Sequence, residues 1–244
     1  MALVDKFNDQ VFCSGSLISN DKVLTTLTCL NKFNLTRIKI ILGQERPHGN
    51  RRSTVERTIA MVSPHHLYNS SSPHYDIGII LLNEKVELGA KIFPVCIPPQ
   101  PIHVEHRVGG GNAAVAVDFG HGRDGNLLMA NVEVLSDRHC NATLRRNDKL
   151  KQYVKNELGD DSFKGIFCAQ HPIDISTTGG PLVSYDGTKF LQFGLLQEDL
   201  RSKVAGAPAV FVDLEGCKVI KFIRERAFNT ARISCIPASQ QEEF

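Results

Sequence analysis

Histidine and cysteine have the widest chemical repertoire in this sequence, and their spacing argues against a metal site. The nine histidines are scattered, without the spacing of zinc ligands. The seven cysteines lie far apart and include no Cys-x-x-Cys pair, which excludes a zinc ribbon or a thioredoxin-like motif. We therefore expect no metal and no cofactor.

Three Asn-x-Ser/Thr triplets mark candidate glycosylation sites, at Asn34, Asn69 and Asn141. Such triplets arise often by chance, but together with widely spaced cysteines they favour an oxidising, secretory environment. The start of the chain lacks the basic and apolar regions of a signal peptide. We therefore expect a secreted protein whose sequence is trimmed or starts at an internal methionine.

Composition excludes several classes of partner. The chain has 244 residues, of which 42% are hydrophobic and 22% charged, as in ordinary globular domains. The net charge of +2 gives no reason to expect a nucleic-acid partner. No run of apolar residues is long enough to predict a membrane span.

Most segments of the chain are predicted to be short strands, and a proline-rich connector divides these strands into two groups. Residues 93–101 contain four prolines, which exclude an interior strand or helix there. Asp186-Gly187 suits the tight turn of a hairpin. The segments rich in Val, Ile, Leu and Thr predict strands at 22–30, 37–43, 55–63, 76–83, 113–119, 127–135, 165–169, 182–185, 190–196 and 209–214.

Helical signals are few. Ser136 could cap a short helix ahead of Cys140. Helical spacing of apolar residues predicts an amphipathic surface helix around residues 150–158 and a C-terminal helix around 219–223. The sequence thus predicts an all-β chain of two strand-rich halves that ends in a helix.

Six motifs, in order along nearly the whole chain, resemble those of trypsin-like serine proteases. They match the family patterns CGGSLIS, VLTAAHCL, NDIALIKL, PVCLP, SGGPLV and PGVY in that order. The corresponding segments are residues 13–19, 23–30, 75–82, 94–98, 178–183 and 208–211. The connector also resembles, loosely, that of non-catalytic homologues in arthropod cascades.

The resemblance implies two six-stranded antiparallel β-barrels packed around a cleft, with a C-terminal helix. It divides the single trypsin-like domain into an N-terminal barrel (1–97), a connector (98–106), a C-terminal barrel (107–214), the helix (215–228) and a tail (229–244).

The resemblance also implies two disulfides, Cys13–Cys29 and Cys140–Cys168. Cys96 has two alternatives, a bridge to Cys217 or a bridge to a segment outside this sequence. One cysteine remains odd in either case.

The family's catalytic triad is degenerate here. Its aspartate matches Asp76, but its histidine position holds Thr28 and its nucleophile position holds Thr178. Thr28 has no nitrogen that accepts a proton near neutral pH, and an unassisted threonine hydroxyl is a poor nucleophile. Losing the histidine or the serine lowers turnover by on the order of 10⁶. Without a histidine, Asp76 needs hydroxyl or backbone donors, and we expect Thr28 to supply one.

The family's other functional positions also differ. The residue before the nucleophile is an aspartate in the family, where it pairs with the new N-terminus after activation, and is Thr177 here. Ser176 replaces the glycine of the oxyanion hole. The substrate-pairing Ser-Trp-Gly strand corresponds to Gln197, Glu198 and Asp199, and the pocket floor falls near Pro172.

Other histidines could in principle replace the missing base. His65 and His66 lie in a predicted surface loop, and His74 precedes Asp76 by two residues but should point away from the cleft in an extended chain. We expect surface roles for all three. The basic residues of the C-terminal helix, Lys218, Lys221, Arg224 and Arg226, are expected to form a solvated face.

The resulting prediction is a catalytically inactive serine protease homologue that acts as a secreted binding or regulatory protein, such as a cofactor or decoy in a proteolytic cascade. Its expected partner is a protease, or a protease substrate, of that cascade. Two alternatives remain open at this stage. One is an active serine-type hydrolase with a rearranged site. The other is a partial or decaying protease gene product.

Overall fold

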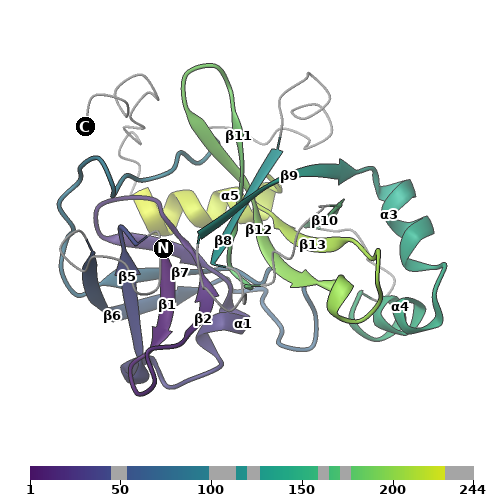
Figure 1. Cartoon of the computed structure of the whole chain (residues 1–244), viewed down its shortest axis with the longest axis horizontal. Coiled ribbons are helices and arrows are strands. Elements are labelled where there is room, and N and C mark those ends of the chain that lie inside the picture. Colours follow the sequence, from purple (N-terminus) through teal and green to yellow (C-terminus); the bar gives the residue numbers. More distant parts are fainter. Residues whose placement is uncertain (45–53, 99–113, 120–126, 159–164, 171–176, 229–244) are drawn as a thin grey trace.

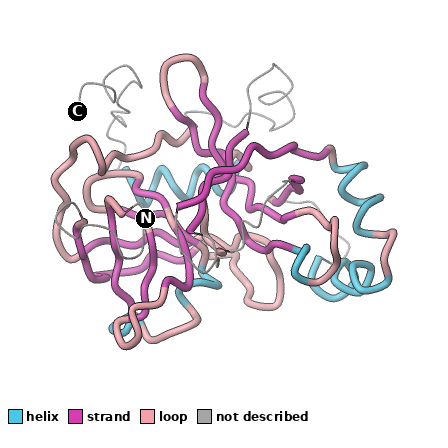
Figure 2. Tube along the Cα trace, viewed as in Figure 1, coloured by secondary structure: helices cyan, strands magenta, loops and turns pink. Residues whose placement is uncertain are grey.

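The computed structural model describes residues 1–44, 54–98, 114–119, 127–158, 165–170 and 177–228. Strands dominate it, as the magenta segments of Figure 2 show. Two sheets hold these strands, one from each half of the chain. The predicted all-β class is confirmed.

The N-terminal sheet has the order β2-β1-β5-β6-β7-β4-β3. Its end strands β2 and β3 are consecutive in the chain and separated only by Gly15, where a Cβ atom would lie 2.8 Å from the carbonyl oxygen of Leu24. Counted as one interrupted strand, they leave six strands around a nearly closed barrel. The strands are β1 (Ala2–Asp5), β2 (Val11–Ser14), β3 (Ser16–Leu17), β4 (Lys22–Thr25), β5 (Ile38–Leu42), β6 (Val55–Pro64) and β7 (Gly78–Leu82).

The C-terminal sheet is a closed six-stranded antiparallel barrel with the order β10-β13-β12-β11-β8-β9. Phe193, Phe211 and Phe167 stack inside it. Its strands are β8 (Ala114–Phe119), β9 (Leu127–Leu135), β10 (Ile166–Gln170), β11 (Pro181–Tyr185), β12 (Phe190–Asp199) and β13 (Ala209–Asp213).

The helical elements are short, and the longest described α-helix is α3 with eight residues. As predicted, the Ser136 hydroxyl caps a helix, accepting the His139 N–H at 3.3 Å. The predicted helix around 150–158 begins as α4 and continues as a π-helix, η3, with its apolar side buried. The helical elements are α1 (Leu27–Leu30), η1 (Leu35–Arg37), α3 (Asp137–Leu144), α4 (Asp148–Tyr153), η3 (Val154–Leu158), η4 (Leu200–Ser202), α5 (Cys217–Ile223) and η5 (Arg224–Phe228).

The two barrels share a core with the C-terminal helix. One cluster of buried side chains combines Ile77 and Leu24 of the first barrel, Leu195 and Val212 of the second, and Phe222 of α5. In Figure 1 the purple and blue strands gather on one side, the green strands on the other, and yellow α5 lies behind the region where they meet. The barrels are therefore packed as one body.

The structure shortens the strand predicted at 22–30 and adds a strand, β1, that was not predicted. The strand predicted at 22–30 ends at Thr25, because the Thr26 side chain accepts the Cys29 N–H at 3.3 Å and starts α1. β1 was not among the predicted strands, although it is buried along its length. None of the described helices is long and apolar enough to cross a bilayer.

Candidate functional site

Asp76 and Thr28 lie side by side at the first turn of α1. Asp76 is fully buried, and its Oδ1 accepts the backbone N–H of Thr28 at 2.8 Å. Thr28 is the second residue of α1, so its N–H is one of the helix donors that lack an intrahelical partner. The expectation that Thr28 supplies a donor to Asp76 is confirmed, through its backbone.

The second oxygen of Asp76 is unsatisfied. Asp76 Oδ2 has no hydrogen-bond partner, and neither does the buried Oε1 of the neighbouring Gln197. Burial raises the pKa of Asp76. Hydrogen bonds from Thr28, Leu27 and the nearby Gln197 amide lower this pKa but do not cancel the effect of burial. Asp76 therefore occupies an environment that disfavours its charge.

Thr178 is placed beside α1 by backbone contacts. Its carbonyl oxygen accepts the Ser14 N–H at 2.9 Å and lies 3.2 Å from the sulfur of Cys29. The next residue, Gly179, has φ of +90° and donates to the carbonyl of Leu196 at 2.7 Å. A side chain there would collide with the carbonyl of Ser14, so this turn requires glycine. The three positions predicted to match the triad, Thr28, Asp76 and Thr178, thus belong to one region between the barrels.

Sequence reasoning missed another buried residue of this region, Asp118, which is 1% exposed. Its Oδ1 accepts the hydroxyl of Ser14 at 2.9 Å, and its Oδ2 accepts the N–H of Thr177 at 2.8 Å. The Thr177 hydroxyl in turn donates to the carbonyl of Phe119. Strand β8 therefore supplies a buried carboxylate beside Thr177. In the resembled family, by contrast, the aspartate stands at the position of Thr177 itself.

Ser14 completes this arrangement from the other barrel. It stands on β2, at the first glycine of the resembled CGG pattern, and its hydroxyl also lies 3.4 Å from the N–H of Phe119. Ser14 and Asp118 are 104 residues apart in sequence, which explains why no local pattern revealed them. Predicted oxyanion residue Ser176 and pocket residue Pro172 lie outside the described residues.

The segment Gln197–Asp199 forms the end of β12. Glu198 pairs with Val210 and Asp199 with Ala209 of β13, after a register shift near Gln197. Both acidic side chains have cationic partners, because Glu198 lies 2.7 Å from Lys203 and Asp199 lies 3.2 Å from Arg201. This strand therefore ends in a charged cluster.

His74 and His139 both lie close to groups outside the predicted triad positions. His74 Nε2 lies 3.3 Å from the carbonyl of Leu158, and His139 lies at the start of α3. His66 is exposed and stacks on His65. The other five histidines lie outside the described residues.

His65 corrects a prediction, because it is 2% exposed and not a surface residue. Its ring stacks on Tyr75 and meets Phe222 edge-on. Its Nδ1 accepts the Leu67 N–H at 3.2 Å, and its Nε2 lies 3.4 Å from the carbonyl of Lys218. Burial lowers the pKa of His65, and the ring packs against Phe222 of α5.

The disulfides agree with the resemblance. Cys13–Cys29 and Cys140–Cys168 are both formed. Cys96 is disulfide-bonded as well. The Cys217 side chain and the whole of Cys235 lie outside the described part of the chain, so the Cys96–Cys217 pairing remains a prediction.

The side chains predicted to form a solvated helix face and two of the three candidate glycosylation sites are exposed. The basic residues Lys218, Lys221, Arg224 and Arg226 are exposed, as a solvated helix face requires. Asn34 and Asn69 are exposed, whereas Asn141 is half-buried and accepts a hydrogen bond from Arg145 at 2.6 Å. No group of side chains suited to a metal ion occurs within the described ranges.

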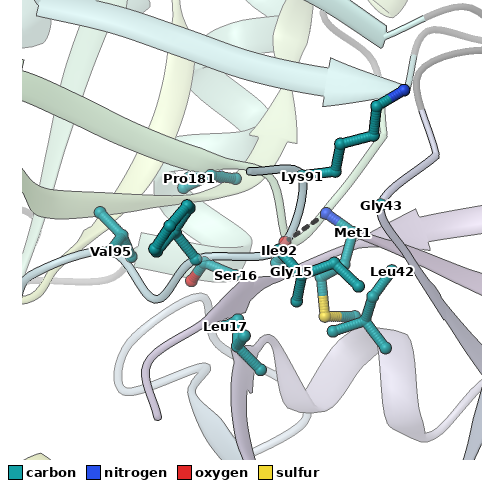
Figure 3. Close-up of a pocket in the computed structure, with 11 residues that line it drawn as sticks. Met1, Gly15, Ser16, Leu17, Leu42, Gly43, Lys91, Ile92, Val95 and Pro181 are labelled. Carbon is teal, nitrogen blue, oxygen red and sulfur yellow. Dashed lines mark hydrogen bonds between the residues drawn. The ribbon is translucent and has the colours of Figure 1, made fainter. Parts of the chain in front are cut away.

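A cavity of about 190 Å³ lies away from the triad positions. Figure 3 shows it between Gly15 and Leu17, the end of β5 at Leu42, and the segment around Ile92. Its lining is mostly apolar, and Thr28, Asp76 and Thr178 do not contribute to it. We assign it no chemistry.

Comparison with known proteins places these observations in one family. Residues 1–220 match the family model named Trypsin. The chain is 31% identical over 118 residues to mannan-binding lectin serine protease 1 of Mus musculus, and this match covers 41% of this chain and 16% of that protein. It is 33% identical over 93 residues to the venom serine protease of Polistes dominula, and this match covers 36% of this chain and 33% of that protein. The chain therefore matches a third or less of the length of either relative.

Proposed function

Since this chain belongs to the trypsin family, we propose that it is a catalytically inactive serine protease homologue. In this role it is a secreted binding or regulatory protein, a cofactor or decoy in a proteolytic cascade. The disulfides Cys13–Cys29 and Cys140–Cys168 support the secretory part of the proposal.

The observation that carries the proposal is the environment of Asp76. In a working triad the aspartate orients a histidine, which takes the proton of the nucleophile. Here Asp76 accepts the N–H of Thr28 instead, and its other oxygen is unpaired. The hydrogen bonds of Asp76 come from Thr28, Leu27 and Gln197, while His65 and His74 lie near the carbonyls of Lys218 and Leu158. In this proposal Thr178 therefore lacks the base that the family's histidine supplies.

A fluorophosphonate probe and peptide-ester substrates test the loss of chemistry. We expect neither labelling nor turnover above background, with an active trypsin-family protease as the parallel control. Labelling that maps to Thr178 would overturn the proposal and favour a hydrolase with a rearranged site.

Back-substitution identifies which residues cause the loss. The double variant Thr28→His/Thr178→Ser restores base and nucleophile and should gain slow labelling. Adding Gln197→Ser removes a bulky amide next to Asp76 and should increase the labelling rate, because the restored imidazole then has room. A correctly folded triple variant without labelling would place the defect elsewhere.

The regulatory role needs a separate measurement. The full-length secreted protein is mixed with an active trypsin-family protease and that protease's protein substrate. A cofactor raises the rate of cleavage and a decoy lowers it. An unchanged rate with proteases of several specificities would contradict a role in proteolysis.

Secretion and glycosylation are tested together. Expression in secretory cells should give a product whose mass falls on treatment with peptide N-glycosidase. Asn34→Gln and Asn69→Gln should each remove one glycan, because both side chains are exposed. An unmodified intracellular product would contradict this part of the proposal.

A further inference from the structure

Four side chains form a cluster beside the end of β12, and we call it the acidic cage. Tyr153 comes from α4, Glu157 from η3, Glu198 from β12, and Lys203 from the turn after η4. The elements α4, η3 and η4 share one hydrophobic cluster, which holds Tyr153 against the second barrel. This cluster also contains Val210 of β13, the residue that pairs with Glu198 of β12. The cage is thus built on packed elements.

Lys203 occupies the cage as a resident cation. Its Nζ lies 2.7 Å from Oε1 of Glu198 and 3.7 Å from Oε1 of Glu157. It also lies 4.7 Å from the centre of the Tyr153 ring, within the range of a cation–π contact. The three charged side chains are 26–41% exposed, so the cage opens to solvent.

The lysine leaves the cage incompletely satisfied. Tyr153 is 4% exposed, and its buried hydroxyl has no hydrogen-bond partner. Burial, together with the charges of Glu198 and Glu157, raises the pKa of Tyr153, so both carboxylates act on this hydroxyl. A buried hydroxyl without a partner is unfavourable and indicates a site for a further donor.

A guanidinium group matches this arrangement better than an ammonium group. It is planar, stacks on aromatic rings, and directs five N–H donors to carboxylates in a fixed fork. It can therefore bond Glu157 and Glu198 together, and either lie on the Tyr153 ring or direct a donor toward the phenolic oxygen. Lys203 makes one short contact, to Glu198.

We propose that the acidic cage is a receptor for an arginine side chain of a protein partner, and that Lys203 fills it until that arginine displaces it. The inference rests on the proposed binding function and gives it a chemical specificity. The exchange conserves the charge of the cage, because one cation replaces another while Lys203 moves into solvent.

The test removes the resident cation. Lys203→Met keeps the stem and empties the cage. Binding of Nα-acetyl-arginine amide and Nα-acetyl-lysine amide is measured by calorimetry on the full chain. We expect the arginine compound to bind the variant about tenfold more tightly than it binds the wild type, and more tightly than the lysine compound binds the variant.

Matched variants locate the binding. Glu198→Gln in the Lys203→Met background should abolish it, and Tyr153→Phe should reduce the preference for arginine over lysine. Lys151→Met is the control, because it removes an exposed ion pair with Asp148 on the same helical segment. If Lys203→Met binds no more tightly than wild type and Lys151→Met, the proposal is wrong and Lys203 is only a structural ion pair.

A folding failure of Lys203→Met does not leave the proposal untested. Titration of folded wild type with a high concentration of the arginine compound should displace Lys203, and Glu198→Gln should weaken this binding. Equal binding by wild type and Glu198→Gln would overturn the proposal. Recovery of the intact arginine compound after the titration distinguishes the failure of the two proposals. Hydrolysis of the compound would contradict the proposal that the chain is catalytically inactive. Absence of binding would contradict only the proposal that the acidic cage receives an arginine side chain.

Discussion

Two buried aspartates near the contact between the barrels have opposite surroundings. Asp118 accepts a hydrogen bond on each oxygen, from Ser14 at 2.9 Å and from Thr177 at 2.8 Å. Asp76 accepts the N–H of Thr28 on one oxygen, and its other oxygen has no partner. Both residues are at most 1% exposed, so burial alone does not distinguish them.

These different surroundings indicate that Asp118 has a structural role, whereas Asp76 stands at a position that the family uses for catalysis. In the inactive homologue that we propose, Asp76 keeps the family's catalytic carboxylate, while Thr28 stands where the family has the histidine that pairs with it. The carboxylate on β8 instead fastens the loop at Thr177 to both barrels, through Ser14 on β2. We interpret Asp118 as a stabilising residue of this chain and Asp76 as a remnant of the triad.

Asp118→Ala should give the largest effect. The substitution leaves the Ser14 hydroxyl and the Thr177 N–H buried without acceptors, and each lost partner destabilises by about 1–3 kcal/mol. We expect the free energy of unfolding to fall by about 3–5 kcal/mol, measured by urea denaturation. A loss below about 1 kcal/mol would show that the loop does not depend on Asp118.

Ser14→Ala should give a smaller loss on the same network. It removes the donor to Asp118 Oδ1 but leaves the bond from Thr177 to Oδ2 intact. The expected loss of unfolding free energy is about 1–2 kcal/mol. In a double-mutant cycle with Asp118→Ala the two effects should be strongly non-additive, and simple additivity would indicate that the two side chains act independently.

The sequence predicted most strands because β-branched and aliphatic runs were bounded by turn residues, as in β9 at Leu127–Leu135. Contacts between residues far apart were predicted only where the family resemblance implied them, as for Asp76 with Thr28 and for the two disulfides. Ser14 and Asp118 carry no mark of their pairing, and Tyr153 was identified only as part of an apolar helix face. His65 lies in a polar segment, yet packing between Tyr75 and Phe222 buries it.

Asp76→Asn should have the opposite sign to the matched change at Asp118. The asparagine oxygen can still accept the Thr28 N–H, while its amide group donates toward the unpaired Oε1 of Gln197. We expect the free energy of unfolding to stay the same or rise by up to about 1 kcal/mol. Asp118→Asn, by contrast, weakens two bonds to a carboxylate and should lower it by about 1–2 kcal/mol. Equal losses in the two variants would remove the distinction between the two aspartates.

The pH dependence of Asp76→Asn gives the smallest and most specific test. Because burial raises the pKa of Asp76, the folded chain keeps this proton at pH values where the unfolded chain, with a pKa of about 3.9, has released it. As the pH rises through this window the wild type loses stability and the variant does not. The variant's advantage should therefore grow with pH and then level off. His65 is destabilising toward acid pH in both proteins, because its pKa is lowered, and this effect cancels in the difference. An advantage that shrinks as pH rises would mean that ionised Asp76 is stabilised by a cation, and the argument for a triad remnant would fail.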